Sequence, residues 1–141
     1  MKDLRIGVIG SGGRGALAMD AHKPGQGSRV VACCDVNSTA LESNRQTYGK
    51  DVFTTKDYRE LLEQDLDAVF VTTPDFLHEE HTLAALDTDA AIYLEKPMAI
   101  TIKGCDRILA KARRKKARLF VGHNMRYMNV FIKMKRLIDQ G

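Results

Sequence analysis

Tryptophan is absent from this sequence of 141 residues, and aromatic residues make up only 6% of it. Proteins that hold single-stranded nucleic acid stack its bases on aromatic side chains, so no such platform is expected here. No apolar run approaches the roughly 18 residues that a membrane-spanning helix requires. The net charge of +4 favours an anionic ligand, and neither nucleic acid nor a membrane is expected as a partner.

Cysteine is also scarce. Cys33, Cys34 and Cys105 are an odd number without regular spacing, which does not form a disulfide framework. Cys33 and Cys34 lie in an apolar run, so packing explains them better than metal or redox chemistry. No signal-peptide pattern precedes the first strand-like segment, which starts at Leu4, and a reducing, cytoplasmic setting is expected.

Metal ligands at a useful spacing are lacking as well. The segment HEEH places His78 and His81 three residues apart, whereas the zinc-protease pattern needs two histidines four residues apart around the glutamate. No third ligand accompanies them, so no metal site is expected. The basic segment from Lys111 to Arg118 lies where a helix leads into a strand, so a solvated helix end explains it better than nucleic-acid binding.

What the sequence does contain is a regular alternation of short apolar runs and longer amphipathic stretches. The apolar runs predict strands at Leu4–Ile9, Arg29–Cys34, Val52–Thr54, Ala68–Thr72, Ala91–Leu94 and Leu119–Val121. The stretches between them predict helices at Ala16–His22, residues 39–48, a short segment after Thr55, His78–Thr88 and Thr101–Arg114. This alternation predicts an α/β fold with a doubly wound parallel sheet, covered by helices on both faces.

Two helix starts are predicted from capping residues. Thr39 and Glu42 form a capping box, and Thr55 is placed to cap the helix that follows it.

The last stretch, Arg126–Asp139, is also predicted to be helical, and its apolar residues cover more than one narrow face. That is more apolar surface than a terminal surface helix usually needs.

A glycine-rich segment, GSGGRG, follows the first predicted strand directly and precedes a helix. Gly10, Gly12 and Gly15 form the pattern G-x-G-x-x-G, with Gly13 and Arg14 inside it. In this context Gly10 makes a tight turn, Gly12 lets the backbone approach a pyrophosphate, and Gly15 lets helix and strand pack closely. The pyrophosphate would lie at the helix N-terminus, where N–H groups favour negative charge, and Arg14 would add a positive charge.

An acidic residue stands where a dinucleotide-binding fold requires one. Asp35 follows the second predicted strand directly, 20 residues after Gly15, in position to accept both hydroxyls of an adenosine ribose. Its charge would repel a 2′-phosphate, and Val36 and Asn37 after it bring no Arg or Lys to bind one. The sequence therefore predicts a Rossmann fold that binds NAD, with NADP less favoured.

Polar side chains also follow the later strands, at the edge that they share with the glycine loop. Ligands of open parallel sheets bind outside the carboxyl ends of the strands. One cleft is therefore expected to contain Thr72, Thr73, His78, Glu95, Lys96, Asn124 and Arg126. His123 either faces this cleft or plays no part in it. Lys96 would lie where the nicotinamide end of the dinucleotide is held.

Four segments, GSGGRG, TTPDFLH, EKP and GHNMRY, occur in the order found in the Gfo/Idh/MocA oxidoreductases, which the chain resembles from about Leu4 to its end. Members of that family are NAD(P)-dependent enzymes that act mostly on sugars, inositols and related polyols. The resemblance implies that Lys96 is catalytic and lies beside the nicotinamide and the substrate hydroxyl. It also implies that Thr73 and Pro74 contact the cofactor and that His78 belongs to this site. Glu95 would orient Lys96 or contact the nicotinamide side.

The chain departs from the family in length. Family members continue with a second α/β domain that carries the substrate pocket. Residues 1–124 are therefore expected to form the dinucleotide-binding domain, and residues 125–141 the helix that leads into the missing one. The expected parent is a homo-oligomeric, NAD-dependent dehydrogenase of a sugar, inositol or related polyol, inactive as these 141 residues alone. Two alternatives stay open: a glycosidase that uses NAD for transient oxidation, and a non-catalytic NAD-binding or interaction module.

Overall fold

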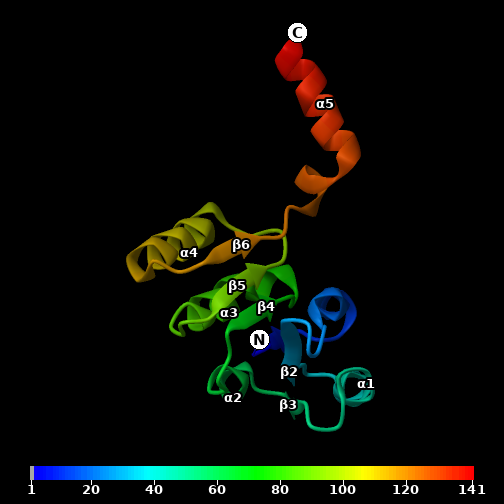
Figure 1. Ribbon diagram of the computed structural model, residues 1–141. Helices are drawn as coiled ribbons and strands as arrows, with labels where there is room; N and C mark the ends of the chain where they lie inside the picture. Colours follow the sequence, from blue (N-terminus) through cyan, green and yellow to red (C-terminus); the bar gives the residue numbers. More distant parts are fainter. Residues whose placement is uncertain (1) are drawn as a thin grey trace.

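The computed structural model describes residues 2–141 and contains one sheet of six strands (Figure 1). The strands are β1 (Leu4–Ile9), β2 (Ser28–Cys34), β3 (Phe53–Thr55), β4 (Ala68–Val71), β5 (Ala91–Leu94) and β6 (Leu119–Val121). Their order is β3-β2-β1-β4-β5-β6, and all neighbouring pairs are parallel. The predicted doubly wound α/β sheet is confirmed, and each observed strand bound lies within one residue of its prediction.

Helices connect the strands and cover both faces of the sheet. They are η1 (Gly13–Ala21), α1 (Ser38–Tyr48), α2 (Tyr58–Leu62), η2 (Asp75–Leu77), α3 (His78–Ala85), α4 (Ile102–Lys115), η3 (Asn124–Tyr127) and α5 (Asn129–Gln140), where η marks a 3-10 helix. Helices η1 and α1 pack on one face, and α2, α3 and α4 pack on the other. Because the chain passes from β3 at one edge to β4 beside β1, the direction of winding reverses between β1 and β4.

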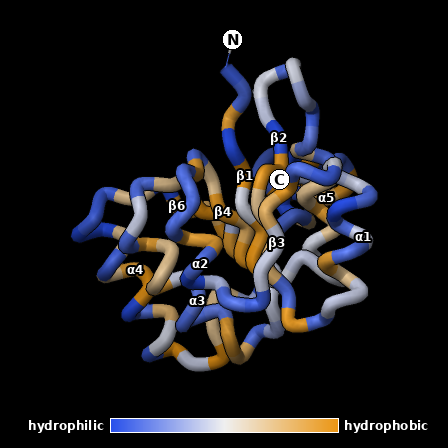
Figure 2. The backbone as a smooth tube through the Cα atoms, turned by 90° about the horizontal axis from the view of Figure 1, so that it is seen from below, coloured by the Kyte–Doolittle hydropathy of each residue, from blue (hydrophilic) through white to orange (hydrophobic). Residues whose placement is uncertain are grey.

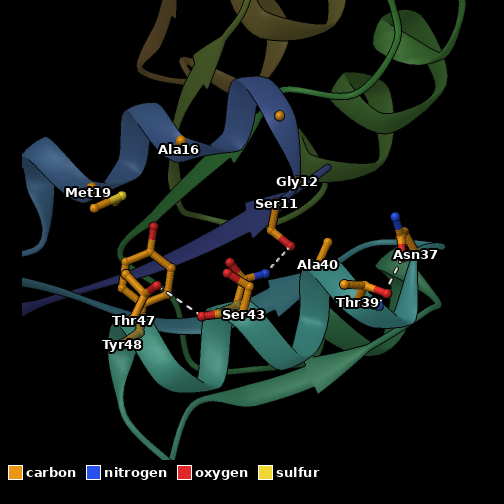
Figure 3. Close-up of a pocket in the computed structure, with 12 residues that line it drawn as sticks. Ser11, Gly12, Ala16, Met19, Asn37, Thr39, Ala40, Ser43, Thr47 and Tyr48 are labelled. Carbon is orange, nitrogen blue, oxygen red and sulfur yellow. Dashed lines mark hydrogen bonds between the residues drawn. The ribbon is translucent and has the colours of Figure 1, made fainter.

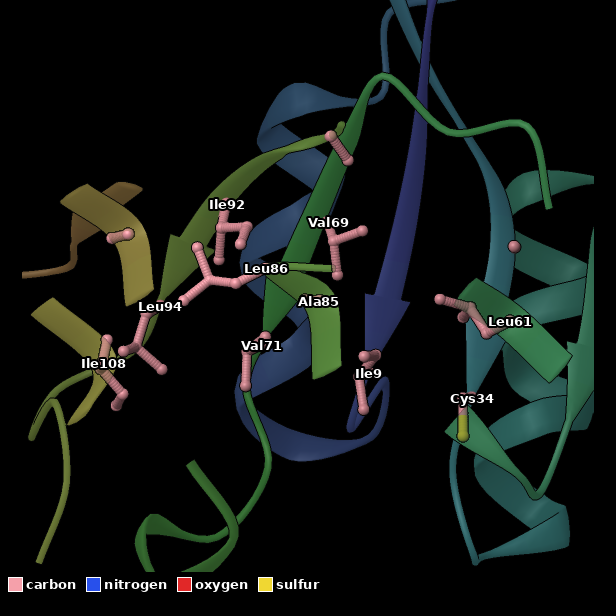
Figure 4. Packing of buried hydrophobic residues seen from close by; sticks show 13 residues of the cluster. Ile9, Cys34, Leu61, Val69, Val71, Ala85, Leu86, Ile92, Leu94 and Ile108 are labelled. Atoms are coloured by element: carbon pink, nitrogen blue, oxygen red, sulfur yellow. The ribbon is translucent and has the colours of Figure 1, made fainter. Parts of the chain in front are cut away.

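Two apolar clusters, one on each face, hold these layers together. The larger lies between the sheet and helices α2, α3 and α4, and its members include Ile9, Leu61, Val69, Val71, Leu86, Ile92, Leu94 and Ile108 (Figure 4). The smaller lies under η1 and α1 and contains Ile6, Val8, Ala18, Val30, Cys33 and Val52. Figure 2 shows the central strands mainly in the colours of hydrophobic residues, as burial on both faces requires.

The first helix differs from its prediction. It begins at Gly13 instead of Ala16, and its nine residues form a 3-10 helix, a type seldom longer than three or four residues. With three residues per turn, side chains three positions apart lie in one column. Gly15 and Ala18 are buried in such a column, and Ala21 packs against the same cluster. These small residues let η1 lie close to the sheet.

The two predicted capping residues are wrong, because a nearer Asx residue caps each helix. Asn37 caps α1, and its Oδ1 accepts a hydrogen bond of 2.9 Å from the N–H of Thr39. Asp57 caps α2 through the N–H of Arg59, also at 2.9 Å. Thr55 is instead the buried last residue of β3. Asn and Asp are strong caps, and each precedes its helix directly.

Helix α5 extends away from the sheet (Figure 1), and none of its residues is buried. Its start falls at Asn129 instead of Arg126, because the 3-10 helix η3 and the extended Met128 come first. The predicted excess of apolar surface is confirmed: one side carries the exposed residues Val130, Phe131, Met134, Leu137 and Ile138, which we call the α5 stripe. Among residues 2–141, no helix is both long and apolar enough to cross a bilayer.

Two isoleucines of α4 test the packing of the larger cluster. Ile108 is fully buried, whereas Ile102 in the same helix is 82% exposed. We expect Ile108→Ala to lower the free energy of unfolding by about 2–5 kcal/mol, because it removes buried carbon and leaves a cavity. Ile102→Ala is the matched control and should change it by less than about 1 kcal/mol. Urea unfolding followed by circular dichroism measures both, and equal losses would contradict this packing.

Candidate functional site

The glycine turn after β1 lies at the point where the sheet reverses its winding. The N–H groups of Gly10 and Ser11 both donate to the carbonyl oxygen of Cys34, at 2.8 and 3.1 Å. Gly10 has φ = +81°, and a Cβ added to it would lie 2.7 Å from the backbone nitrogen of Thr73. A Cβ on Gly15 would lie 2.5 Å from the carbonyl oxygen of Gly10. Only glycine fits at either position, as the loop pattern predicts.

The Asp35 side chain holds this turn by accepting hydrogen bonds from backbone N–H groups. Its Oδ2 accepts a hydrogen bond of 2.8 Å from the N–H of Gly12, and its Oδ1 accepts one of 2.9 Å from the N–H of Asn37. A Cβ on Gly12 would come within 3.0 Å of Oδ2. Since Gly12 precedes η1 and Asn37 precedes α1, the carboxylate joins the starts of two helices. Negative charge is favourable there.

Thr72 and Thr73, the two threonines after β4, have different hydrogen-bond partners. The buried Thr72 hydroxyl lies 3.1 and 3.0 Å from the carbonyl oxygens of Ile9 and Gly10, so it supports the glycine turn from behind. The Thr73 hydroxyl is instead hydrogen-bonded to Nδ1 of His81 at 3.0 Å. Of the two, Thr73 lines an open pocket.

His78 lies inside the protein rather than in the cleft. It is almost fully buried, with Nδ1 at 2.6 Å from the carbonyl oxygen of Pro97 and Nε2 at 2.8 Å from that of Thr73. The imidazole therefore ties the loop after β4 to the loop after β5. The sequence correctly predicted that His78 lies near the carboxyl edge of the sheet. It could not show that the ring points into the protein, because that direction depends on how α3 packs.

Glu95 and Lys96 point in different directions. The Glu95 carboxylate is 3% exposed, and its Oε1 lies 3.1 Å from Nε and 3.0 Å from Nη2 of Arg14 in the glycine loop. Its Oε2 accepts a hydrogen bond of 2.6 Å from the backbone N–H of Lys96. The Lys96 side chain is exposed. Glu95 thus holds the backbone at Lys96, and it links the glycine loop to the end of β5.

Lys96 lines a pocket at the β6 end of the carboxyl edge. The pocket has a volume of about 420 Å³ and is lined by Arg14, Lys96, Gly122, His123, Asn124, Met125 and Arg126. It brings together four of the predicted site residues from three segments far apart in the sequence. His123, whose part the sequence left open, lies in it.

A second pocket, which we call the Asp35 pocket, lies on the other side of the glycine turn. Its volume is about 310 Å³, and its lining includes Gly10, Asp35, Val36, Lys56, Tyr58, Thr73, Pro74, Phe76, Leu77 and His81. Val36 and Phe76 are large apolar residues with exposed fractions of 83% and 63%. Phe76, Tyr58 and Lys56 were not predicted as site residues from the sequence. The sequence feature that could have indicated them is their position shortly after the ends of β3 and β4.

Two groups in the Asp35 pocket are unsuited to acid–base or thiolate chemistry at neutral pH. Burial, with the charge of Asp35 next in importance, raises the pKa of the Cys34 thiol to about 12. Burial lowers the pKa of His81, whose ring packs against Tyr58 at 4.4 Å between centroids. Cys34 therefore stays a thiol and His81 stays neutral.

Among residues 2–141, no three His, Cys, Asp or Glu side chains are grouped to hold a metal ion.

A third hollow lies between η1 and α1, on the far side of Gly12 (Figure 3). Its volume is about 370 Å³, and hydroxyl and amide side chains contribute much of its lining. Asn44 and Ser11 are buried members of this lining, and the Asn44 side-chain amide donates a hydrogen bond of 2.6 Å to the Ser11 hydroxyl.

Residues 4–123 match the Gfo/Idh/MocA family, which is described as an oxidoreductase family with an NAD-binding Rossmann fold. The chain belongs to this family. An inositol 2-dehydrogenase of Klebsiella pneumoniae subsp. pneumoniae is 33% identical over 98% of this chain and 42% of its own length. An inositol 2-dehydrogenase/D-chiro-inositol 3-dehydrogenase of Lacticaseibacillus casei is 35% identical over 98% of this chain and 41% of its own length.

Solved structures of the Gfo/Idh/MocA family share the fold over nearly the whole chain. The myo-inositol dehydrogenase from Lactobacillus casei in complex with NAD(H) and myo-inositol matches with a TM-score of 0.88 and 34% identity. The match covers 99% of this chain and 42% of that one. The chain therefore spans less than half the length of the relatives that it matches.

The pair of Arg14 and Glu95 provides a test of the link between the glycine loop and β5. We expect Arg14→Gln to lower the free energy of unfolding by about 2 kcal/mol, because it leaves the buried Glu95 carboxylate without its charged partner. Lys135→Gln is the control, since Lys135 and Asp139 form an exposed pair that contributes less than about 1 kcal/mol. Chemical denaturation measures both, and a loss for Arg14→Gln no larger than that of the control would refute the link.

Proposed function

We propose that the chain binds NAD(H) and forms the dinucleotide-binding part of an oxidoreductase that acts on an inositol or related polyol. The observation that carries the proposal is the order of features along the carboxyl edge. The Asp35 pocket, the glycine turn and the Lys96 pocket follow one another across the point where the sheet reverses its winding. This is the position at which open α/β sheets bind dinucleotides.

The adenosine half would occupy the Asp35 pocket. Val36 and Phe76 offer apolar surface to a base, and Thr73 and Pro74 form part of the same wall. The Asp35 carboxylate stands at the end of β2, where it would accept the ribose hydroxyls and disfavour a 2′-phosphate. NAD is therefore proposed as the preferred cofactor.

The pyrophosphate would lie against the glycine turn. The first N–H groups of a helix have no partner within it, and those at the start of η1 follow Gly12 directly. Gly13 has φ = +35° and open space around its Cα, and Arg14 adds a positive charge on the side of the Lys96 pocket. Thr72 and His78 would contribute to this binding through the loops that they hold.

The nicotinamide, which supplies the hydride acceptor or donor, would be held in the Lys96 pocket. There the Lys96 ammonium would donate a hydrogen bond to the reacting oxygen and stabilise its developing negative charge, or relay its proton. Glu95 fixes the backbone from which Lys96 extends. Asn124 and Arg126 bring hydrogen-bonding groups of the kind that hydroxyls of a polyol require. Similarity to inositol dehydrogenases supports this substrate class.

The setting and the assembly of the protein are proposed on other grounds. All three cysteines are free thiols, and two of them are buried, as suits a reducing cytoplasm. The exposed α5 stripe supports a homo-oligomer.

Titration with NADH and NADPH tests the proposed function. We expect tighter binding of NADH, and we expect Gly12→Val to abolish the binding of both while leaving a folded sheet. The new side chain would collide with Asp35 and occupy the pyrophosphate position. Ala110→Val places the same valine side chain at an exposed position of α4 and should leave binding unchanged.

Calorimetry or NADH fluorescence provides the affinities, and circular dichroism checks the fold. With NAD and a panel of inositols and sugars, the 141 residues alone should give no measurable turnover, because the open Lys96 pocket would not hold a substrate in a reactive geometry. Unchanged NADH affinity in a folded Gly12→Val variant would overturn the proposed site. Brisk oxidation of a polyol would show that these residues suffice as an enzyme.

Self-association through the α5 stripe gives a separate prediction. We expect the chain to elute as a dimer or larger species, and Leu137→Lys to shift it towards the monomer, because a charge cannot be buried cheaply in an apolar contact. Arg136→Lys is the control, since Arg136 is an exposed residue of α5 outside the stripe. Size-exclusion chromatography with light scattering measures the mass. A wild-type monomer at high concentration would contradict the prediction.

A further inference from the structure

Lys56 lies beside Asp35 at the ends of two neighbouring strands. It follows Thr55, the last residue of β3, and the N–H of Asp35 donates to the carbonyl oxygen of Thr55 at 3.2 Å. Lys56 and Asp35 both line the Asp35 pocket. No Arg or Lys directly follows Asp35 in the sequence, but the sheet brings a lysine to this place from the adjacent strand.

The Lys56 ammonium is the one positive charge in the lining of the Asp35 pocket, within residues 2–141. The other basic side chain there, His81, is neutral because burial lowers its pKa. Arg59, close by in sequence, lies over the Tyr58 ring and pairs with Asp57 and Glu80.

Lys56 itself is exposed, and in the described part of the chain it forms no ion pair. Asp35, in contrast, already accepts two backbone hydrogen bonds. The charge of Lys56 is therefore available to a ligand, while that of Asp35 is partly engaged in holding the glycine turn.

We propose that Lys56 is a second determinant of cofactor choice, which offsets the repulsion between Asp35 and a ribose 2′-phosphate. This inference rests on the proposed binding of NAD(H). The flexible stem of a lysine lets its ammonium approach a phosphate as a point charge. At a separation of a few ångströms near a protein surface, such an attraction is comparable to the repulsion from one carboxylate. Discrimination against NADP(H) is then weaker than Asp35 alone would produce.

The two cofactors should respond differently to loss of this charge. The adenosine ribose of NAD(H) carries only hydroxyls, so its affinity depends little on Lys56. The 2′-phosphate of NADP(H) brings about two negative charges into the pocket, so its affinity depends on Lys56 strongly. Because the contact is exposed, salt should weaken it.

The experiment compares the intact chain with Lys56→Gln and Lys56→Glu. Lys50→Gln is the matched control, since Lys50 is an exposed lysine just before β3 and lies outside the Asp35 pocket. Calorimetric titrations with NADH and NADPH at low and high salt provide the dissociation constants. We expect Lys56→Gln to weaken NADPH binding about tenfold and NADH binding less than twofold, with a larger loss of NADPH binding for Lys56→Glu. High salt should narrow these differences.

The possible outcomes distinguish failure of this inference from failure of the proposed function. If the intact chain binds NADH and both Lys56 variants keep the same ratio of NADPH to NADH affinity, Lys56 plays no part in cofactor choice. An equal loss for both cofactors, or NADPH binding too weak to detect in the intact chain, would also overturn the inference. Failure of the intact chain to bind either cofactor would overturn the proposed function, and this inference with it.

Discussion

The close approach of backbone to backbone at the glycine turn is the constraint on which the site depends. There β1 ends against the loop that follows β4, and the space between them admits no Cβ on Gly10. A hydrogen bond from Gly12 to the Asp35 carboxylate and one from the Thr72 hydroxyl to Gly10 hold the turn from two sides. Every feature assigned to the dinucleotide is placed relative to this turn: the Asp35 pocket on one side, the Lys96 pocket on the other and the start of η1 between them.

Behind this edge lies a layer of buried polar groups that hold the loops and leave the exposed groups free for a ligand. Thr72 supports the turn, His78 joins the loops after β4 and β5, and Glu95 joins β5 to Arg14. A buried polar group costs free energy unless it is hydrogen-bonded, and each of these three makes at least one hydrogen bond. Lys96 therefore extends from a backbone that is fixed at several points, as its proposed role requires.

The fold was predictable because its signals are local and repeated. Continuous apolar runs such as that of β5 identify strands buried on both faces, and the glycine spacing after β1 identifies the turn. Helix starts were less predictable, because Thr39 and Asn37 are both good caps. Among the site residues, sequence order placed Glu95, Lys96 and His78 at one edge but did not show which of them point inward. Nor did it reveal Lys56, which enters the Asp35 pocket through the pairing of β2 with β3. Such contacts depend on the packed sheet.

The column of small residues in η1 restricts how this segment can change in length. Inserting one residue after Gly15 would turn every later side chain by about 120° around the axis of a 3-10 helix. Ala18 would then leave the sheet, and a larger neighbour such as Leu17 would be pushed against it. An insertion of three residues would restore the column and lengthen the helix by about 6 Å. Natural variation in this segment should therefore preserve its length or change it in threes, whereas loops without such a period tolerate single insertions.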